Sequence, residues 1–333
     1  MKYRKYFRLI ITFALLFIVI SDSDTAKVAT KDGINLCLNT VLPGILIFLF
    51  IGNLLSDDLM GFCVPFLESA FGIPKCSCGY FFVGQLCGYP VGAKLLQDAS
   101  RQGKICSKDA MRMICFCNNA SPAFIIGILS SVFQNQWVGI IMWLIQIASS
   151  ILLAILTRKE PAPWIPVPAD NNQKKQQITD ILKTASTICT WIILFKILLG
   201  YLDKVIIQTH YSLPKTLLWG SLEVTNGLMA LKTLNTESLQ FVISSFFLSF
   251  GGICVLLQTR AVAPDLPMKQ YILSRLLHSG VSCLLASLSS YFLFKNAYIN
   301  IRIIFLFAAV ATICYIIFYF NQNNGSIQRR NVV

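Results

Sequence analysis

Polar and helix-breaking residues interrupt two apolar stretches in the first half of the chain. The first interruption is Gly88-Tyr89-Pro90, and the second is Asn118-Asn119-Ala120-Ser121-Pro122. Proline lacks an N–H group and disfavours helix in the residue before it, so Ser121-Pro122 should end one helix and begin another. The new helix would begin with unpaired N–H groups and a partial positive charge, which suit a carboxylate or a phosphate. The sequence therefore predicts an anion site here.

Two similar interruptions occur in the second half, at Glu223-Val224-Thr225-Asn226-Gly227 and at Ser249-Phe250-Gly251-Gly252. Broken helix is tolerated in a membrane where it is packed in protein or lines a polar cavity, and discontinuous helices often mark a transporter's binding site. We therefore predict that all four interruptions meet around one substrate. The residues predicted to bind it are Gly88, Tyr89, Pro90, Asn118, Asn119, Ser121, Pro122, Glu223, Thr225, Asn226, Gly251 and Gly252.

Other roles remain open for the polar members of this set. Hydrogen bonding between helices is the alternative for the asparagines and serine. Capping of a half-helix is the alternative for Thr225 and Asn226. Glu223 is an acid within an apolar segment and so a functional candidate, with protonation coupled to transport, pairing with Lys196 or cation binding as its roles. Lys196 itself is expected to snorkel to the interface.

Two further polar residues lie near the start of a later apolar stretch. Arg275 is expected to be an interfacial anchor, and His278 is left without a role. No enzyme motif is present, and we expect that the protein is not an enzyme.

The chain has 333 residues, of which 55% are hydrophobic and 13% charged. Its apolar runs of about 20 residues match a hydrocarbon layer of about 30 Å, so the composition predicts an all-α polytopic membrane protein. The net charge of +13 raises the question of nucleic acid. Lys and Arg concentrate on the segments assigned to the cytoplasm, as the positive-inside rule requires, so we expect no nucleic-acid surface.

Twelve cysteines are scattered along the chain, and we expect those in the apolar segments to pack as small apolar side chains. The pairs Cys76-Ser77-Cys78 and Cys115-Phe116-Cys117 keep a metal site open. Because the chain has two His and no Cys-x-x-Cys, we expect no metal and no other cofactor.

The apolar pattern predicts a topology with both termini in the cytoplasm. A loop at Ser21–Gly33 lies outside, Pro43-Gly44 kinks a span, and re-entrant hairpins lie at Gly79–Leu96 and Leu217–Leu231. For the first apolar run, a cleaved signal peptide is the alternative to a retained anchor. The predicted spans are Leu9–Ile20, Ile34–Leu55, Ala110–Val132, Trp137–Leu156, Ile178–Gly200, Leu239–Gln258, Tyr271–Leu293 and Asn300–Phe320.

The chain divides into two similar halves. Residues 1–33 form an anchor and external loop, 34–157 a first repeat, 158–177 a Pro-rich cytoplasmic linker, and 178–333 a second repeat with a C-terminal helix. Each repeat contains one re-entrant hairpin and one broken transmembrane helix. Because three crossings per half is an odd number, the second copy must be inserted upside down, which gives an inverted-topology repeat.

Three motifs resemble those of a known family. They are GYPVGAK (Gly88–Lys94) with the basic loop after it, FCNNASPAFIIG (Phe116–Gly127) and LEVTNG (Leu222–Gly227). They look like the sporulation integral membrane protein family typified by YlbJ, within the wider nucleoside-recognition or Gate domain group. The resemblance implies a role in endospore formation, placement in the outer forespore membrane, and movement of dipicolinic acid toward the forespore. The basic loop contains Lys94, Arg101, Lys104, Lys108 and Arg112.

These observations predict a transporter of a small anionic metabolite, dipicolinate above all, that works by alternating access of two inverted repeats. Tyr89 would stack on the flat ring of the substrate. A carrier of nucleosides or other polar solutes is one alternative, and a structural or assembly protein of the spore envelope is another. The partners considered are the small-molecule substrate, the lipid bilayer, and a second copy of the chain or other sporulation membrane proteins.

Overall fold

The structure is a computed structural model that describes residues 16–55, 62–162, 177–206 and 212–294, together with residues 6, 9, 13, 313 and 315–317. Over these residues the fold is helical, without strands, so the predicted all-α class is confirmed. Much of the predicted spans Leu9–Ile20 and Asn300–Phe320, and residues 163–176 of the predicted linker, lie outside the described residues.

The helices follow one another with short connections. In chain order they are α2 (Ser23–Leu36), the π-helical turn η1 (Cys37–Val41), α3 (Leu42–Leu55), α4 (Pro65–Phe71), α5 (Cys78–Cys87), α6 (Val91–Arg101), α7 (Ser107–Cys117), α8 (Pro122–Phe133), α9 (Gln136–Leu156), α10 (Gln177–Ile206), α11 (Ser212–Leu222), α12 (Val224–Ala230), the 3₁₀ turn η4 (Leu231–Thr233), α13 (Glu237–Phe250), α14 (Gly252–Val262) and α15 (Met268–Leu293).

Within the described part of the chain, five helical stretches are long and apolar enough to cross a membrane. They coincide with the five spans predicted between residues 110 and 293. Two of the stretches each join two helices end to end, α7 with α8 and α13 with α14, and each junction lies at a predicted interruption. The stretches are Ser107–Phe133, Gln136–Leu156, Thr179–Lys204, Glu237–Val262 and Met268–Leu293.

The N-terminal region differs from the prediction. Ser21–Gly33 is helical, so the prediction of an external loop there is wrong. Helix α2 continues through η1 into α3, and the N–H of Leu42 bonds to the carbonyl of Cys37, five residues back. Pro43 has no N–H to offer to the preceding turn, which accounts for a π-helical turn just before it. The irregularity predicted at Pro43-Gly44 therefore lies about one turn earlier.

The first short helix pair folds back on itself at Gly88-Tyr89-Pro90. A Cβ atom added at Gly84 in α5 or at Gly92 in α6 would overlap the carbonyl oxygen of Cys117. In one continuous helix two residues eight apart would be about 12 Å from each other. Here both lie against the same atom, so α5 and α6 form a hairpin around the end of α7.

The second short pair folds back in the same way at Glu223. A Cβ atom at Gly227 in α12 would overlap the Cα atom of Gly220 in α11. These two residues are seven apart, which in a continuous helix would separate them by about 10 Å. The absence of both side chains lets the two helix backbones touch.

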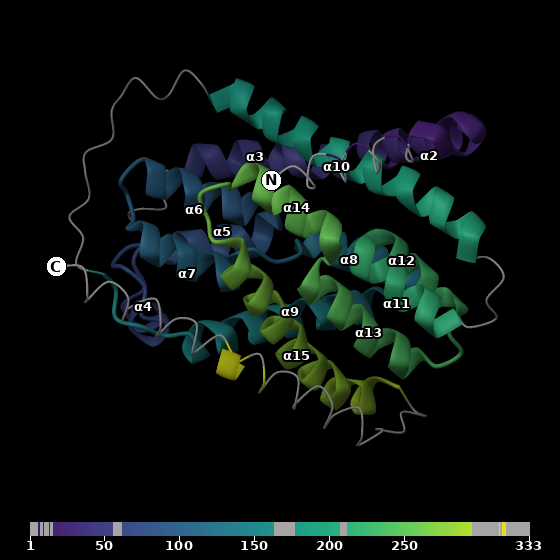
Figure 1. Cartoon of the computed structure of the whole chain (residues 1–333). Helices are drawn as coiled ribbons and strands as arrows, with labels where there is room; N and C mark the ends of the chain where they lie inside the picture. The colour runs from purple at the N-terminus through teal and green to yellow at the C-terminus, as the bar shows by residue number, and fades with distance from the viewer. Residues whose placement is uncertain are drawn as a thin grey trace.

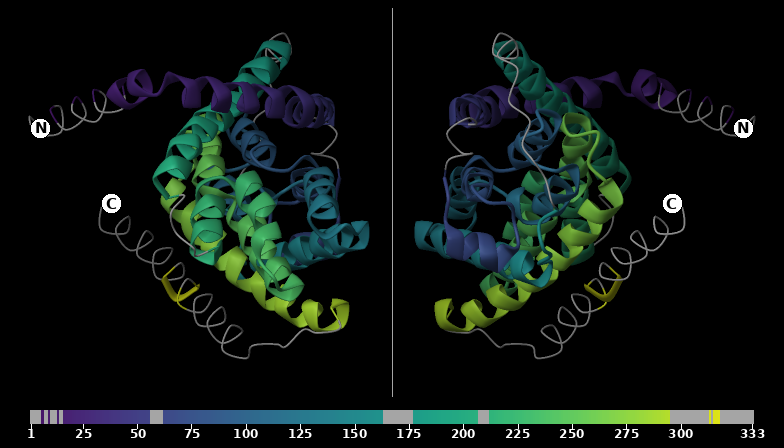
Figure 2. Two further views of the ribbon diagram at one scale, coloured as in Figure 1. Left: turned by 90° about the vertical axis from the view of Figure 1, so that its right-hand side faces the viewer. Right: turned by 90° about the vertical axis from the view of Figure 1, so that its left-hand side faces the viewer.

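The helices pack as one bundle with α2 and α10 side by side along one edge (Figure 1). Figure 2 shows α2 and α3 lying across that edge of the bundle. The opposite part of the bundle contains α9, α13 and α15, and α15 packs against both of the other two. The hairpins and the broken helices lie between these two parts, where two apolar clusters form the core.

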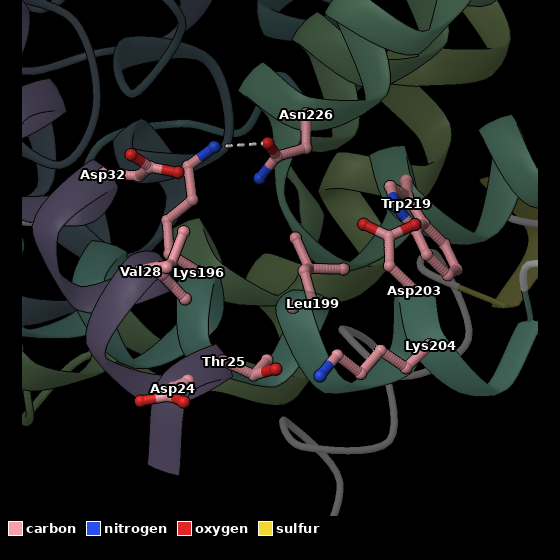
Figure 3. A pocket seen from close by; sticks show the side chains of 12 residues that line it. Asp24, Thr25, Val28, Asp32, Lys196, Leu199, Asp203, Lys204, Trp219 and Asn226 are labelled. Atoms are coloured by element: carbon pink, nitrogen blue, oxygen red, sulfur yellow. Dashed lines mark hydrogen bonds between the residues drawn. The ribbon is translucent and has the colours of Figure 1, made fainter. Parts of the chain in front are cut away.

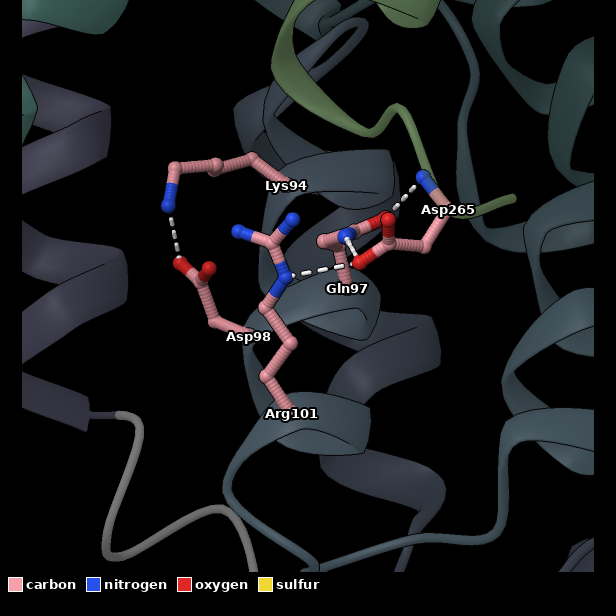
Figure 4. A network of polar contacts seen from close by, with 5 residues as sticks. All are labelled: Lys94, Gln97, Asp98, Arg101 and Asp265. Carbon is pink, nitrogen blue, oxygen red and sulfur yellow. Dashed lines mark hydrogen bonds and ion pairs between the residues drawn. The ribbon is translucent and has the colours of Figure 1, made fainter.

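The segment predicted as a basic loop is instead the end of α6 and the start of α7. Its cations are engaged in the structure rather than free. Lys94 pairs with Asp98 at 2.5 Å, and Arg101 pairs with Asp265 of the α14–α15 connection at 2.8 Å (Figure 4). Gln97 also hydrogen-bonds to Asp265. The hydrogen bond from Arg101 holds the pKa of Asp265 below its usual value. This network ties α6 to the second half of the chain.

The cysteines divide into two groups. Cys63 and Cys76 form a disulfide across α4, which the sequence analysis did not predict. Cys37, Cys254 and Cys283 are free and buried, as expected for small apolar side chains. Among the described residues, no group of three His, Cys, Asp or Glu side chains is placed to hold a metal ion.

The contact between Gly84 and Cys117 gives a stability prediction. Because a Cβ at Gly84 overlaps backbone, Gly84→Ala should destabilise the fold by about 1–3 kcal/mol, more than the gain of up to about 1 kcal/mol from a better helix former. Thermal unfolding of the purified protein in detergent measures the effect. Gly127→Ala in α8 is the control, since a Cβ there meets nothing within 4 Å. Equal stability of the two variants would contradict the packing role.

Candidate substrate site at the helix breaks

The two interruptions of the first half are in direct contact. The N–H of Tyr89 donates to the carbonyl of Asn119 at 2.5 Å. Gly88 has a left-handed φ of 79°, and a Cβ there would come within 2.7 Å of the Ser121 nitrogen. Glycine is required at this position for both reasons. The turn of the hairpin is thus fitted against the break between α7 and α8.

The two interruptions of the second half are also in contact. Gly251 and Gly252 have φ values of 82° and 74°, which end α13 and begin α14. A Cβ at Gly252 would lie 3.1 Å from the carbonyl oxygens of Gly220 and Leu222. The break between α13 and α14 therefore lies against the turn between α11 and α12.

The two pairs of interruptions meet across the halves. Ala120, Val224 and Val255 belong to one buried apolar cluster, and Tyr89 packs against that cluster. Helix α12 packs on α8, and α14 packs on α6. All four interruptions thus lie together inside the protein, although a role in substrate binding stays a prediction.

Asn118 joins the break to three other helices. Its Oδ1 accepts a hydrogen bond from the N–H of Ala93 at 3.2 Å. Its Nδ2 donates to the hydroxyl of Tyr271 at 2.7 Å and lies 3.4 Å from the hydroxyl of Thr259. Each polar atom of the side chain is therefore bonded within the protein.

Asn119 is committed in the same way. Its Nδ2 donates to the hydroxyl of Ser150 in α9 at 2.8 Å and to the carbonyl of Phe116 at 3.0 Å. Its Oδ1 accepts from Arg275 at 2.9 Å. Both asparagines are fully buried. The alternative of hydrogen bonding between helices thus describes what these side chains do in this conformation.

The start of α8 is less open to an anion than predicted. Pro122 is the first helical residue and has no N–H. The hydroxyl of Ser121 accepts from the N–H of Phe124 at 3.3 Å, and Ser121 itself is extended, as expected before a proline. Ser121 therefore already caps this helix.

Glu223, rather than Thr225 or Asn226, caps the second half-helix. Its carboxylate accepts from the N–H of Thr225 at 3.0 Å and from the N–H and Nδ2 of Asn226, both at 2.8 Å. The predicted direct pairing with Lys196 is not observed. Lys196 donates to Oδ1 of Asn226 at 2.5 Å and is part-buried, so its predicted snorkelling is also wrong.

Asn226 also lines an open pocket of about 490 Å³ between α2, α10, α11 and α12. Figure 3 shows the Lys196–Asn226 hydrogen bond at one end of this pocket. The chain from Lys196 through Asn226 to Glu223 connects the pocket with the helix break. The pocket is lined by both signs of charge, from Asp24, Asp32, Asp203, Lys196 and Lys204.

Arg275 is the residue that the sequence analysis misplaced. It is 1% exposed, so it is not an interfacial anchor. Its guanidinium donates to the carbonyl of Asn118 at 2.8 Å and to the carbonyl of Cys115. A signal for this position exists in the sequence, because residues 271, 275, 278 and 282 of α15 are polar at helical spacing on one face.

Four buried polar atoms among the described residues have no hydrogen-bond partner. Two of them belong to the break region, the hydroxyl of Tyr89 and the Nε of Arg275. A third is Nδ1 of His278, whose Nε2 lies 2.8 Å from the hydroxyl of Ser149. The fourth is Nε1 of Trp143. Buried polar groups without partners are uncommon, so three of them near one face of α15 point to a ligand or to a second conformation.

The fold and the long apolar helices define an integral membrane protein with several spans. The chain is similar to sporulation integral membrane protein YlbJ of Bacillus subtilis (strain 168). The two are 26% identical over 335 aligned positions, which cover 83% of this chain and 81% of the relative. The resemblance to the YlbJ-like proteins is therefore confirmed. No protein-family model matches the chain, and no solved structure is a significant match.

The capping contacts of Glu223 give a prediction. Glu223→Ala removes acceptors from two backbone N–H groups and should lower the free energy of unfolding by about 0.5–2 kcal/mol, whereas Glu223→Gln should cost less because one oxygen remains. Thermal unfolding compares both variants with Glu237→Ala, an exposed acid in the first turn of α13. If the Glu223 variants were no less stable than the Glu237 variant, the cap would not matter.

Proposed function

We propose that this integral membrane protein carries a small anionic metabolite during sporulation, with dipicolinic acid as the substrate and the forespore as its destination. In this proposal the protein lies in the outer forespore membrane, and two inverted repeats, each with a re-entrant hairpin, give alternating access. The similarity to a sporulation integral membrane protein supports the biological setting. The resemblance of the three motifs supports the choice of substrate.

The observation that carries the proposal is the meeting of four helix breaks beside two buried donors without partners. A membrane protein that needed only stability would be served by continuous helices, because a continuous helix satisfies its own backbone groups. Broken helices that meet inside the protein are the usual setting of a transporter's binding site. The unpaired hydroxyl of Tyr89 and the Nε of Arg275 are donors, which suit an anion.

A structural or assembly role in the spore envelope is the second candidate. It is favoured by the complete engagement of Asn118 and Asn119 within the protein, which needs no ligand. The two candidates differ in what removing the Tyr89 hydroxyl should do. That group contributes no hydrogen bond to the fold, so a purely structural protein has no use for it.

Uptake of labelled dipicolinate by the purified protein in liposomes tests the proposal. Tyr89→Phe keeps the ring and removes only the hydroxyl. We expect uptake per folded protein to fall by about two- to tenfold, the value of one hydrogen bond to substrate, with thermal stability unchanged or slightly higher. Tyr291→Phe, at an exposed position on α15, is the matched control and should transport as the wild type does.

The outcomes separate the candidates. No uptake by the wild-type protein above that of empty liposomes would contradict the carrier. Uptake by Tyr89→Phe equal to that of Tyr291→Phe would remove Tyr89 from the site. A loss of uptake that follows only the amount of folded protein would favour the structural role.

A further inference from the structure

Arg275 is a buried cation that lacks an anionic partner. In the described part of the chain no carboxylate forms an ion pair with it, and its hydrogen-bond acceptors are two backbone carbonyls and the amide oxygen of Asn119. Charged side chains within membrane-spanning helices are costly and as a rule pair with another group. Its Nε–H has no acceptor at all. The structure therefore leaves both the charge and one donor of this guanidinium without an opposite charge.

A second buried arginine shows what a structural guanidinium looks like in the same molecule. Arg112 donates to the carbonyls of Phe71 at 2.7 Å and Gly72, at the end of α4. It also has a carboxylate at 3.8 Å, that of Asp109, and none of its donors is left without a partner. Arg275 resembles it in capping a helix end and differs in having no carboxylate and an unpaired Nε.

The nearest acid to the break is already occupied. The carboxylate of Glu223 is close enough to the Tyr89 hydroxyl to interact with it electrostatically, as is the guanidinium of Arg275. Glu223, however, accepts three hydrogen bonds at the start of α12. It is thus bound to its own half-helix, and the donors of Tyr89 and Arg275 face the same region without it.

We infer that Arg275, with the hydroxyl of Tyr89, binds a carboxylate group of the transported anion and sets the selectivity for anions over neutral solutes. This inference rests on the proposed function and deepens it. A guanidinium presents its Nε–H and Nη–H in a fork that matches the two oxygens of a carboxylate. A carboxylate is also a stronger acceptor than the carbonyls that Arg275 contacts in this conformation, so the exchange is favourable. The predicted recognition by helix N-termini is replaced by a side chain, because Ser121 and Glu223 already cap those termini.

Binding of matched ligands to the full-length protein in lipid nanodiscs tests the inference. The probes are dipicolinate, isophthalate, which has the two carboxylates without the ring nitrogen, and pyridine-2,6-dicarboxamide, which is neutral and of the same shape. We expect the wild type to bind both dianions at least about tenfold more tightly than the diamide, as expected for charged hydrogen bonds. Arg275→Gln should abolish this ratio, and Arg275→Lys should keep part of it because the charge remains without the fork.

Arg112→Gln is the matched control, since it removes a buried guanidinium that caps a helix end elsewhere. It should lower stability and leave the ratio unchanged. A full ratio in folded Arg275→Gln or in folded Arg275→Lys together with its loss in Arg112→Gln would overturn the inference, and uptake of dipicolinate by such a protein would leave the proposed function standing. A wild type that binds isophthalate but takes up no dipicolinate would support the inference for another carboxylate and overturn the substrate. Failure to bind any of the three probes would overturn both.

Discussion

Backbone hydrogen bonding is the constraint on which this fold depends, because lipid offers no partner to a carbonyl or N–H that a broken helix releases. Helix α7 ends at Cys117, and the carbonyls near that end receive donors from elsewhere in the chain. The side chain of Gln85 in α5 donates to the carbonyl of Phe116 at 2.9 Å, and Arg275 in α15 donates to those of Cys115 and Asn118. The break is therefore a junction between distant helices rather than a local defect.

The break between the two helices of the second hairpin is satisfied differently. Glu223 bonds to residues within three positions of itself, and the glycines around it let the two short helices touch. The break of the first half draws its donors from α5 and α15, whereas this one is completed within its own hairpin. The α11–α12 hairpin therefore keeps its hydrogen bonds when it moves as a unit. Loosening the first break instead requires the bonds from α15 to open.

The sequence was sufficient to predict the all-α class, five of the spans and the place of each interruption, because Gly, Pro and Asn act on the backbone at their own positions. It was not sufficient for Arg275, Lys196 and the helical residues 21–33. Their roles depend on which side chains the tertiary fold brings near, and distance along the chain does not give that. The disulfide between Cys63 and Cys76 was missed for the same reason. Polar residues at helical spacing on α15 were the one available clue to Arg275.

In the carrier that we propose, the hydrogen bonds of Arg275 connect binding with movement. The guanidinium holds the end of α7 by its carbonyls, so a carboxylate that takes its donors competes directly with that helix end. A ligand shifts a conformational equilibrium only through a difference in its affinity for the two states. An anion satisfies this condition here, since it gains the guanidinium only where the break has released it. A neutral solute gains no such advantage, so its presence would leave the two conformations as populated as before.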